Sequence, residues 1–224
     1  RAVMKRFAEL FTALDQTTKT NAKVAALAEY LRAAPESDRL WTMALLSGRR
    51  PRRTVTTTRL REWAADQAGI PLWLFEEAYP IVGDLAETIA LVLPPARQSS
   101  DESLTHWIDQ TRQIGQKPEA DRRAGILSAW DQLDTTERFL FNKLITGSFR
   151  IGVSQKLMTR ALSQATGIEE TKLAQRLMGD WTPDTTSFEA LVLRDAPSAA
   201  LSKPDPFYLA NQLADPPERL GAPA

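Results

Sequence analysis

Residues 139–162 of the chain read FLFNKLITGSFRIGVSQKLMTRAL. Apolar residues recur every three or four positions before Gly147, and they do so again after Ser154. This spacing predicts an amphipathic helix on each side, and glycine is common just past a helix end. Arg150 and a second glycine, Gly152, lie between the two helices. The stretch therefore predicts a helix, a glycine stop, a short basic loop and a second helix.

A weaker copy of this pattern occurs 98–99 residues earlier in the chain. Residues 41–48, WTMALLSG, align with residues 140–147, LFNKLITG, and both segments end in glycine. The loop that follows in the first copy, residues 49–54, reads RRPRRT and is also basic. We therefore expect a duplicated helical hairpin with pseudo-two-fold symmetry, whose halves cover about residues 20–93 and 118–181.

The remainder of the chain shows the same helical periodicity and no sustained strand-like alternation. It predicts an all-α, compact bundle of about eleven or twelve helices in a single domain, residues 1–196. Ser37 and Asp38 are expected to cap one helix, and the six tryptophans are expected in the core. Residues 94–100 read as a connecting linker. Residues 197–224 hold six of the fourteen prolines and are expected to form an extended linker.

Positive charge is concentrated in two windows, although 28 basic and 28 acidic residues give a formal net charge of zero. Residues 39–61 contain seven basic residues and residues 139–168 contain four, and neither window contains an acid. Local basic stripes, more than net charge, indicate phosphate binding. Because both windows include the equivalent loops of the repeat, we interpret them together as a candidate site for nucleic acid.

Several classes of function lack the residues they need. The chain has no cysteine, and His106 is its only histidine, so thiolate metal sites and His-based triads are excluded. No apolar run approaches a membrane span, and no secretory signal opens the sequence. These features predict a soluble cytoplasmic protein without a membrane partner or a bound metal.

The two loops suit a phosphate backbone because each leads into a helix N-terminus, where unpaired N–H groups and the positive dipole end attract anions. Thr56, Thr57 or Thr58 can cap the first helix, and Ser154 can cap the second. Gly152 is expected either to adopt a positive φ or to let the chain approach a phosphate closely, and Phe149 is expected to fill the core. The predicted DNA-binding residues are Arg49, Arg50, Arg52, Arg53, Thr56, Lys143, Gly147, Ser148, Arg150, Gly152, Ser154 and Lys156.

The stretch from 139 to 162 resembles a signature in the N-terminal DNA-binding domain of ATP-dependent DNA ligases. That signature has Thr/Ser-Gly, then Arg-Ile/Leu-Gly and later Ala-Leu, as Thr146-Gly147, Arg150–Gly152 and Ala161-Leu162 do here. Residues 7–23 and 206–213 also look like the bacterial form of these enzymes. The resemblance implies an all-helical domain that wraps the minor groove of nicked duplex DNA. It assigns DNA contact to Gly147, Ser148, Arg150, Gly152 and Ser154, whereas Arg49 to Arg53 rest on the repeat and the charge.

The resemblance also implies a nucleotidyltransferase domain and an OB-fold domain after this one. In the family a lysine in a Lys-x-Asp-Gly motif takes AMP from ATP with a divalent metal, here expected to be magnesium. This sequence has no such motif, since Lys203-Pro-Asp-Pro has proline in place of the glycine. We therefore expect a monomeric, non-catalytic DNA-binding fragment without a cofactor, which ends where the catalytic domain would begin.

Two alternatives from other classes remain open. Duplicated helical hairpins often form protein-interaction scaffolds, which would show a large exposed apolar groove and little salt-dependent DNA binding. A helical RNA-binding domain would need exposed aromatic side chains for base stacking, and neither basic loop is rich in them.

Overall fold

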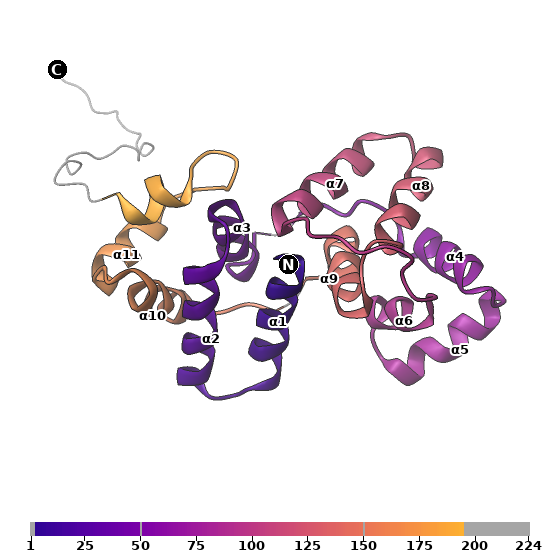
Figure 1. Cartoon of the computed structure of the whole chain (residues 1–224), viewed down its shortest axis with the longest axis horizontal. Helices are drawn as coiled ribbons and strands as arrows, with labels where there is room; N and C mark the ends of the chain where they lie inside the picture. Colours follow the sequence, from indigo (N-terminus) through magenta and orange to yellow (C-terminus); the bar gives the residue numbers. More distant parts are fainter. Residues whose placement is uncertain (1–2, 50, 150, 195–224) are drawn as a thin grey trace, which may run out of the picture.

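A computed structural model describes residues 3–49, 51–149 and 151–194, and Figure 1 shows their arrangement. The described residues contain helices and no strand, which confirms the all-α prediction and the expected number of helices. Arg50, Arg150 and the predicted linker 197–224 lie outside the described residues. The helices are α1 (Val3–Gln16), α2 (Thr20–Ala33), α3 (Glu36–Leu46), α4 (Thr57–Ala68), α5 (Leu72–Val82), α6 (Leu85–Val92), α7 (Leu104–Gln116), α8 (Glu119–Trp130), α9 (Thr135–Thr146), α10 (Gln155–Thr166), α11 (Glu170–Leu177) and a short π-helical turn, η1 (Glu189–Leu193).

The duplication extends over nearly all of the described chain. Helix α10 begins and ends 98 residues after α4, and α7 to α11 follow one another in the same order and at nearly the same spacing as α1 to α5. The buried residues correspond as well, since Met4 and Phe7 of α1 match Leu104 and Trp107 of α7. The repeat is therefore one of whole half-domains and is longer than the sequence pattern indicated.

The two helices on either side of each basic loop do not pack as a hairpin, so this part of the prediction is wrong. Helix α3 packs on α7, whereas α4 packs on α5 and α6; likewise α9 packs on α6, whereas α10 packs on α2 and α11. Helices α1, α3, α7 and α9 lie in the middle of the molecule in Figure 1, with α2, α10 and α11 on one side and α4, α5, α6 and α8 on the other. Each basic loop therefore leads from the centre to an outer group.

The centre is held together by matching contacts across the pseudo-two-fold axis. Helix α1 packs on α9 as α7 packs on α3, and α1 and α7 also touch each other. Each half contains one buried hydrogen bond between residues twelve apart: Thr42 Oγ1 donates to the Tyr30 hydroxyl over 2.9 Å, and Trp130 Nε1 donates to Asn142 Oδ1 over 2.8 Å. Since buried polar groups are nearly always paired, these bonds join α2 to α3 and α8 to α9 at equivalent points of the two halves.

Two further expectations need correction. Helix α3 begins at Glu36, so Ser37 and Asp38 do not cap it. Asp38 is fully buried and accepts instead from the backbone N–H groups of Leu104 and Thr105 at 3.1 and 2.9 Å, at the start of α7. Five of the six tryptophans are buried as predicted, but Trp73 is 66% exposed. Among the described residues, no helix has both the length and the apolar character needed to cross a bilayer.

Helix α9 begins with a buried carboxylate that gives a testable pH dependence. Glu137 Oε1 accepts from the Asp134 backbone N–H at 2.9 Å in a capping box, while Glu137 Oε2 is buried without a partner. Burial raises the pKa of Glu137 above its ordinary value. A raised carboxyl pKa means that its contribution to stability is present below the ordinary pKa and is lost as the pH rises through the folded-state pKa.

We therefore expect Glu137→Gln to keep the capping bond and to be at least as stable as the parent at pH 7. The variant should also show a smaller loss of stability between pH 4 and 7, measured by thermal unfolding. Glu137→Ala is the control, because it loses the bond and should be less stable by about 1 kcal/mol. A Glu137→Gln variant that is less stable at pH 7 and has an unchanged pH profile would contradict this assignment.

Candidate nucleic-acid interface

The first basic loop (residues 47–56) and the second (residues 147–154) begin in the same way. At the end of α3, Gly48 N–H donates to the carbonyl of Leu45 and Arg49 N–H donates to that of Ala44, at 3.2 and 2.9 Å. The corresponding bonds at the end of α9 run from Gly147 to Leu144 and from Ser148 to Lys143, at 3.3 and 3.0 Å. Both glycines have a positive φ, 92° and 68°. This is the Schellman motif, and it turns the chain out of each helix at equivalent points.

The two loops then cross each other at the centre of the molecule. Thr54 N–H donates to the Ile145 carbonyl at 2.7 Å, and Val153 N–H donates to the Leu46 carbonyl at 3.1 Å. Thr54 and Val153 are 99 residues apart, as are Leu46 and Ile145, so the two bonds are equivalent under the pseudo-two-fold axis. Reciprocal contacts of this kind are typical of a symmetric interface. The crossing fixes the loops side by side, and the sequence analysis did not predict it.

Both loops end in a side-chain cap, as predicted. The Thr56 hydroxyl accepts from Arg59 N–H at 3.3 Å at the start of α4, and the Ser154 hydroxyl accepts from Leu157 N–H at 3.1 Å at the start of α10. A hydroxyl cap leaves the other N–H groups of the first turn without an intrahelical partner. The crossing loops therefore place two helix N-termini, with their positive dipole ends, at equivalent positions.

Three of the predicted cations are exposed on these loops and on the start of α10. The side chains of Arg52, Arg53 and Lys156 form no hydrogen bond or ion pair with any described residue, and all three residues are exposed. Two further predicted positions, Arg50 and Arg150, lie outside the described residues. Because an unpaired exposed cation keeps its full attraction for an anion, this group of three cations is the part of the predicted site that is free to bind a phosphate.

Two other predicted cations are already used within the protein. The Lys143 side chain is only 12% exposed and forms an ion pair of 2.7 Å with Asp84, the residue that caps α6. The Arg49 guanidinium lies 4.4 Å from the centre of the Trp181 ring and donates to the Gly179 carbonyl at 3.5 Å. Lys143 therefore joins α9 to α6, and Arg49 joins the first loop to the segment after α11. Neither belongs with the three free cations.

The remaining predicted positions lie in the second loop, against the first. An ideal Cβ at Gly147 would lie 3.6 Å from Arg53 N, and one at Gly152 would lie 3.3 Å from the Leu46 carbonyl oxygen. Gly152 does not have a positive φ. The first of its two expected roles, a positive-φ backbone position, is therefore wrong. A close approach of the protein's own backbone accounts for a glycine there. The Ser148 hydroxyl is 2.7 Å from the Thr146 hydroxyl and is half-buried.

Gly147 should be sensitive to substitution because of its backbone conformation. A Cβ at Gly147 has room, but its φ of 68° disfavours an L side chain, so Gly147→Ala should cost about 1 kcal/mol of unfolding free energy. Gly147→Asn should cost less, since asparagine tolerates this conformation. Gly115→Ala in α7 is a matched control and should be neutral or stabilising. Chemical denaturation would measure all three variants, and a Gly147→Ala variant as stable as the parent would contradict the strain.

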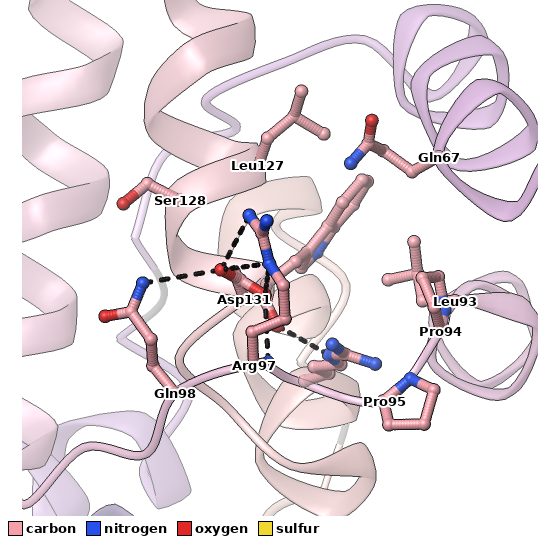
Figure 2. Close-up of a pocket in the computed structure, with 11 residues that line it drawn as sticks. Gln67, Leu93, Pro94, Pro95, Arg97, Gln98, Leu127, Ser128 and Asp131 are labelled. Atoms are coloured by element: carbon pink, nitrogen blue, oxygen red, sulfur yellow. Dashed lines mark hydrogen bonds and ion pairs between the residues drawn. The ribbon is translucent and has the colours of Figure 1, made fainter.

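A separate groove of about 600 Å³ lies between α4, α8 and the connection from α6 to α7, and Figure 2 shows its lining. Asp131 at the end of α8 accepts from Arg97 Nε at 3.1 Å with both of its oxygens and from the Arg97 N–H at 3.0 Å. These hydrogen bonds lower the pKa of Asp131 below its ordinary value. Arg138 Nε donates to the Trp130 carbonyl at 2.7 Å. The hydrogen bonds from Arg97 to Asp131 thus anchor residues 94–100 to the end of α8, and both oxygens of the Asp131 carboxylate already accept hydrogen bonds.

A comparison with known protein families identifies the family of the chain. The model of the family described as DNA ligase N terminus matches residues 4–180, which include both loops and all the helices from α1 to α11 except the first residue of α1. The chain belongs to the DNA ligase N-terminal domain family. The predicted resemblance is therefore confirmed, and membership in a ligase family implies DNA as a partner in general. No curated protein sequence gives a significant match to the chain.

In this DNA ligase N-terminal domain, the sequence analysis missed the residues that hold the two loops together. Thr54 and Val153 donate the crossing hydrogen bonds through backbone N–H groups, which carry no side-chain signal. Their carbonyl partners, Leu46 and Ile145, look like ordinary core positions in the sequence. The available signal was the repeat itself, since equal spacing of these four positions is what a pseudo-two-fold crossing requires.

Proposed function

We propose that this DNA ligase N-terminal domain holds duplex DNA by its sugar-phosphate backbone through the two crossing loops. The observation that carries the proposal is the reciprocal pair of hydrogen bonds from Thr54 to Ile145 and from Val153 to Leu46. These bonds fix two equivalent basic loops, each followed by a helix N-terminus. Phosphate binding at helix N-termini and by arginine and lysine does not depend on base sequence.

A pseudo-two-fold protein surface fits duplex DNA because the two strands of a duplex run antiparallel and are themselves related by two-fold axes. One loop can then bind each strand across the minor groove, with Arg52 and Arg53 on one side and Lys156 on the other. Such an arrangement positions the duplex without reading its bases. Within a ligase, the expected ligand is a nicked duplex, whose ends must be held in line.

We further propose that sealing of the nick is performed by a nucleotidyltransferase domain of the parent ligase, with ATP and magnesium. The sequence contains no Lys-x-Asp-Gly motif. Among residues 3–49, 51–149 and 151–194, no cluster of three or more acidic or histidine side chains is arranged to hold a metal ion. Both observations support the proposal that adenylation takes place in that other domain. Incubation with labelled ATP and magnesium should leave no label covalently bound to the chain.

A binding titration at several salt concentrations tests the proposed grip. The chain should bind nicked and intact duplexes of unrelated sequence and should bind single strands more weakly. The logarithm of the affinity should fall by about 0.9 per phosphate neutralised for each tenfold increase in salt. An affinity for duplex that is unchanged between low and moderate salt would contradict the proposal and favour the scaffold alternative.

A further inference from the structure

Helix α5 exposes an apolar surface that the proposed DNA grip does not use. Leu72, Trp73, Leu74 and Ile81 are 41, 66, 40 and 86% exposed. Trp73, Glu77 and Ile81 follow one another at intervals of four residues, so they lie on one face of the helix. We call Trp73, Leu74, Glu77 and Ile81 the α5 face, because these four residues lie on one side of the helix whereas Leu72 lies on the side opposite Ile81. Helix α5 lies at the outer edge of the molecule in Figure 1.

The duplication provides an internal comparison for this face. Helix α11 occupies the equivalent place in the second half, and Phe75 of α5 and Leu173 of α11 are both fully buried, 98 residues apart. The three residues before Leu173 are exposed and polar: Glu170, Thr171 and Lys172. The three residues before Phe75 are exposed but apolar: Leu72, Trp73 and Leu74. Among the first four residues of this helix, the fold therefore needs an apolar side chain only at the fourth, which is Phe75 in α5 and Leu173 in α11. The three exposed apolar residues on α5 require another explanation.

The charge around the α5 face restricts what can cover it. Residues 62–96 contain six acidic residues and no basic residue. Four of these acids are paired with cations from outside the window: Glu62 with Arg59, Asp66 with Arg123, Glu76 with Arg61 and Asp84 with Lys143. The exposed side chains of Glu77 and Glu87 form no ion pair or hydrogen bond with any described residue. The unpaired carboxylate of Glu77 on α5 disfavours a phosphate there. It also opposes a symmetric contact with a second copy, because a symmetric contact brings the same acids together.

The C-terminal part of the same chain does not complement this surface either. Residues 195–224 contain four acidic residues, Asp195, Asp205, Asp215 and Glu218, against two basic ones, Lys203 and Arg219. We propose that the α5 face is a docking site for a cationic amphipathic helix of a protein partner. Apolar side chains of that helix would cover Trp73, Leu74 and Ile81, and its lysines or arginines would lie beside Glu77.

The probe for this proposal is a synthetic helical peptide of 14 residues with leucines along one face and lysines elsewhere. A second peptide has glutamate in place of every lysine. Trp73 provides the readout, because the other five tryptophans are at most 8% exposed and a soluble quencher such as acrylamide reaches Trp73 most readily. Binding of the lysine peptide should protect the fluorescence from quenching, and the glutamate peptide should bind at least tenfold more weakly.

The matched variant takes its residues from α11: Leu72→Glu, Trp73→Thr and Leu74→Lys together. It leaves the net charge unchanged, and the equivalent residues of α11 show that the fold accepts them. Because this variant lacks Trp73, calorimetry would measure its peptide binding, which should be at least tenfold weaker than that of the parent. Circular dichroism and binding to nicked duplex should be unchanged, so this result is independent of the DNA proposal.

Three results would overturn the proposal. The first is an equal affinity for the lysine and glutamate peptides, because charge would then not select the partner. The second is undiminished binding of the lysine peptide to the triple variant, because binding would then be elsewhere on the acidic surface. The third is a concentration-dependent dimer in sedimentation that the triple variant abolishes, because the occupant would then be a second copy.

Discussion

Affinity for duplex DNA should fall about 100-fold when Arg52, Arg53 and Lys156 are all replaced with serine. Each of these exposed side chains is expected to contribute one phosphate contact of about 1 kcal/mol, and about 3 kcal/mol corresponds to slightly more than two decades in affinity. The dependence of log K on log salt should become shallower by about 2.7, or about 0.9 for each lost contact. Anisotropy of a labelled nicked duplex at several salt concentrations measures both quantities.

Replacement of Lys19, Lys117 and Lys172 with serine is the charge-matched control. These three lysines are also exposed and lie outside both loops. The control removes the same net charge, so any loss that it shows measures the general attraction of the protein for DNA. If the control variant lost as much affinity as the loop variant, DNA binding would follow net charge and the crossing loops would not be its site.

Phe149→Ala should lower the free energy of unfolding by about 3–5 kcal/mol, which is typical for the loss of a buried phenylalanine. Phe149 is 1% exposed, as the sequence analysis predicted, and its ring centre is 6.0 Å from that of Phe7 and 5.4 Å from that of Phe11. These contacts anchor the second loop to α1. The substitution therefore leaves a cavity under the loop, and the loop loses its attachment to the centre of the molecule.

Chemical denaturation of this variant measures the stability loss, and Phe149→Leu is the control. Leucine fills most of the space but loses the aromatic contacts, so the loss should be about 1.5 kcal/mol or less. At temperatures where Phe149→Ala remains folded, it should also bind duplex more weakly, because the second loop is no longer held in place. A loss of stability below about 1 kcal/mol would show that Phe149 does not anchor the loop.

Local features of the fold could be predicted from the sequence because they depend on neighbouring residues. The glycine stops at Gly48 and Gly147 and the caps at Thr56 and Ser154 are determined by backbone preferences over a few positions. Helical periodicity similarly predicted the number of helices. The role of Asp38 was not predictable in this way, since its partners Leu104 and Thr105 are more than sixty residues away.

The packing of helices from one half of the repeat on helices of the other half could not be predicted from the sequence. A repeated helix–loop–helix sequence is compatible with a packed hairpin and with a crossing, because both arrangements bury the same apolar positions. The choice depends on how α3 fits α7 and how α10 fits α2, which periodicity does not encode. For the same reason Lys143 was predicted to bind DNA, whereas its ammonium group is paired with Asp84 at the start of α6 and is largely removed from solvent. Trp73 was expected in the core because apolar periodicity does not show which face has a neighbour.

Backbone amide shifts of the ¹⁵N-labelled chain on addition of a nicked duplex test the central claim most directly. If the crossing loops hold the two strands, the amides of residues 47–56 and 147–154 should shift together and saturate at the same DNA concentration, while those of α5 stay unchanged. Shifts confined to one loop, or located mainly on α5, would contradict a DNA grip built on the pseudo-two-fold crossing.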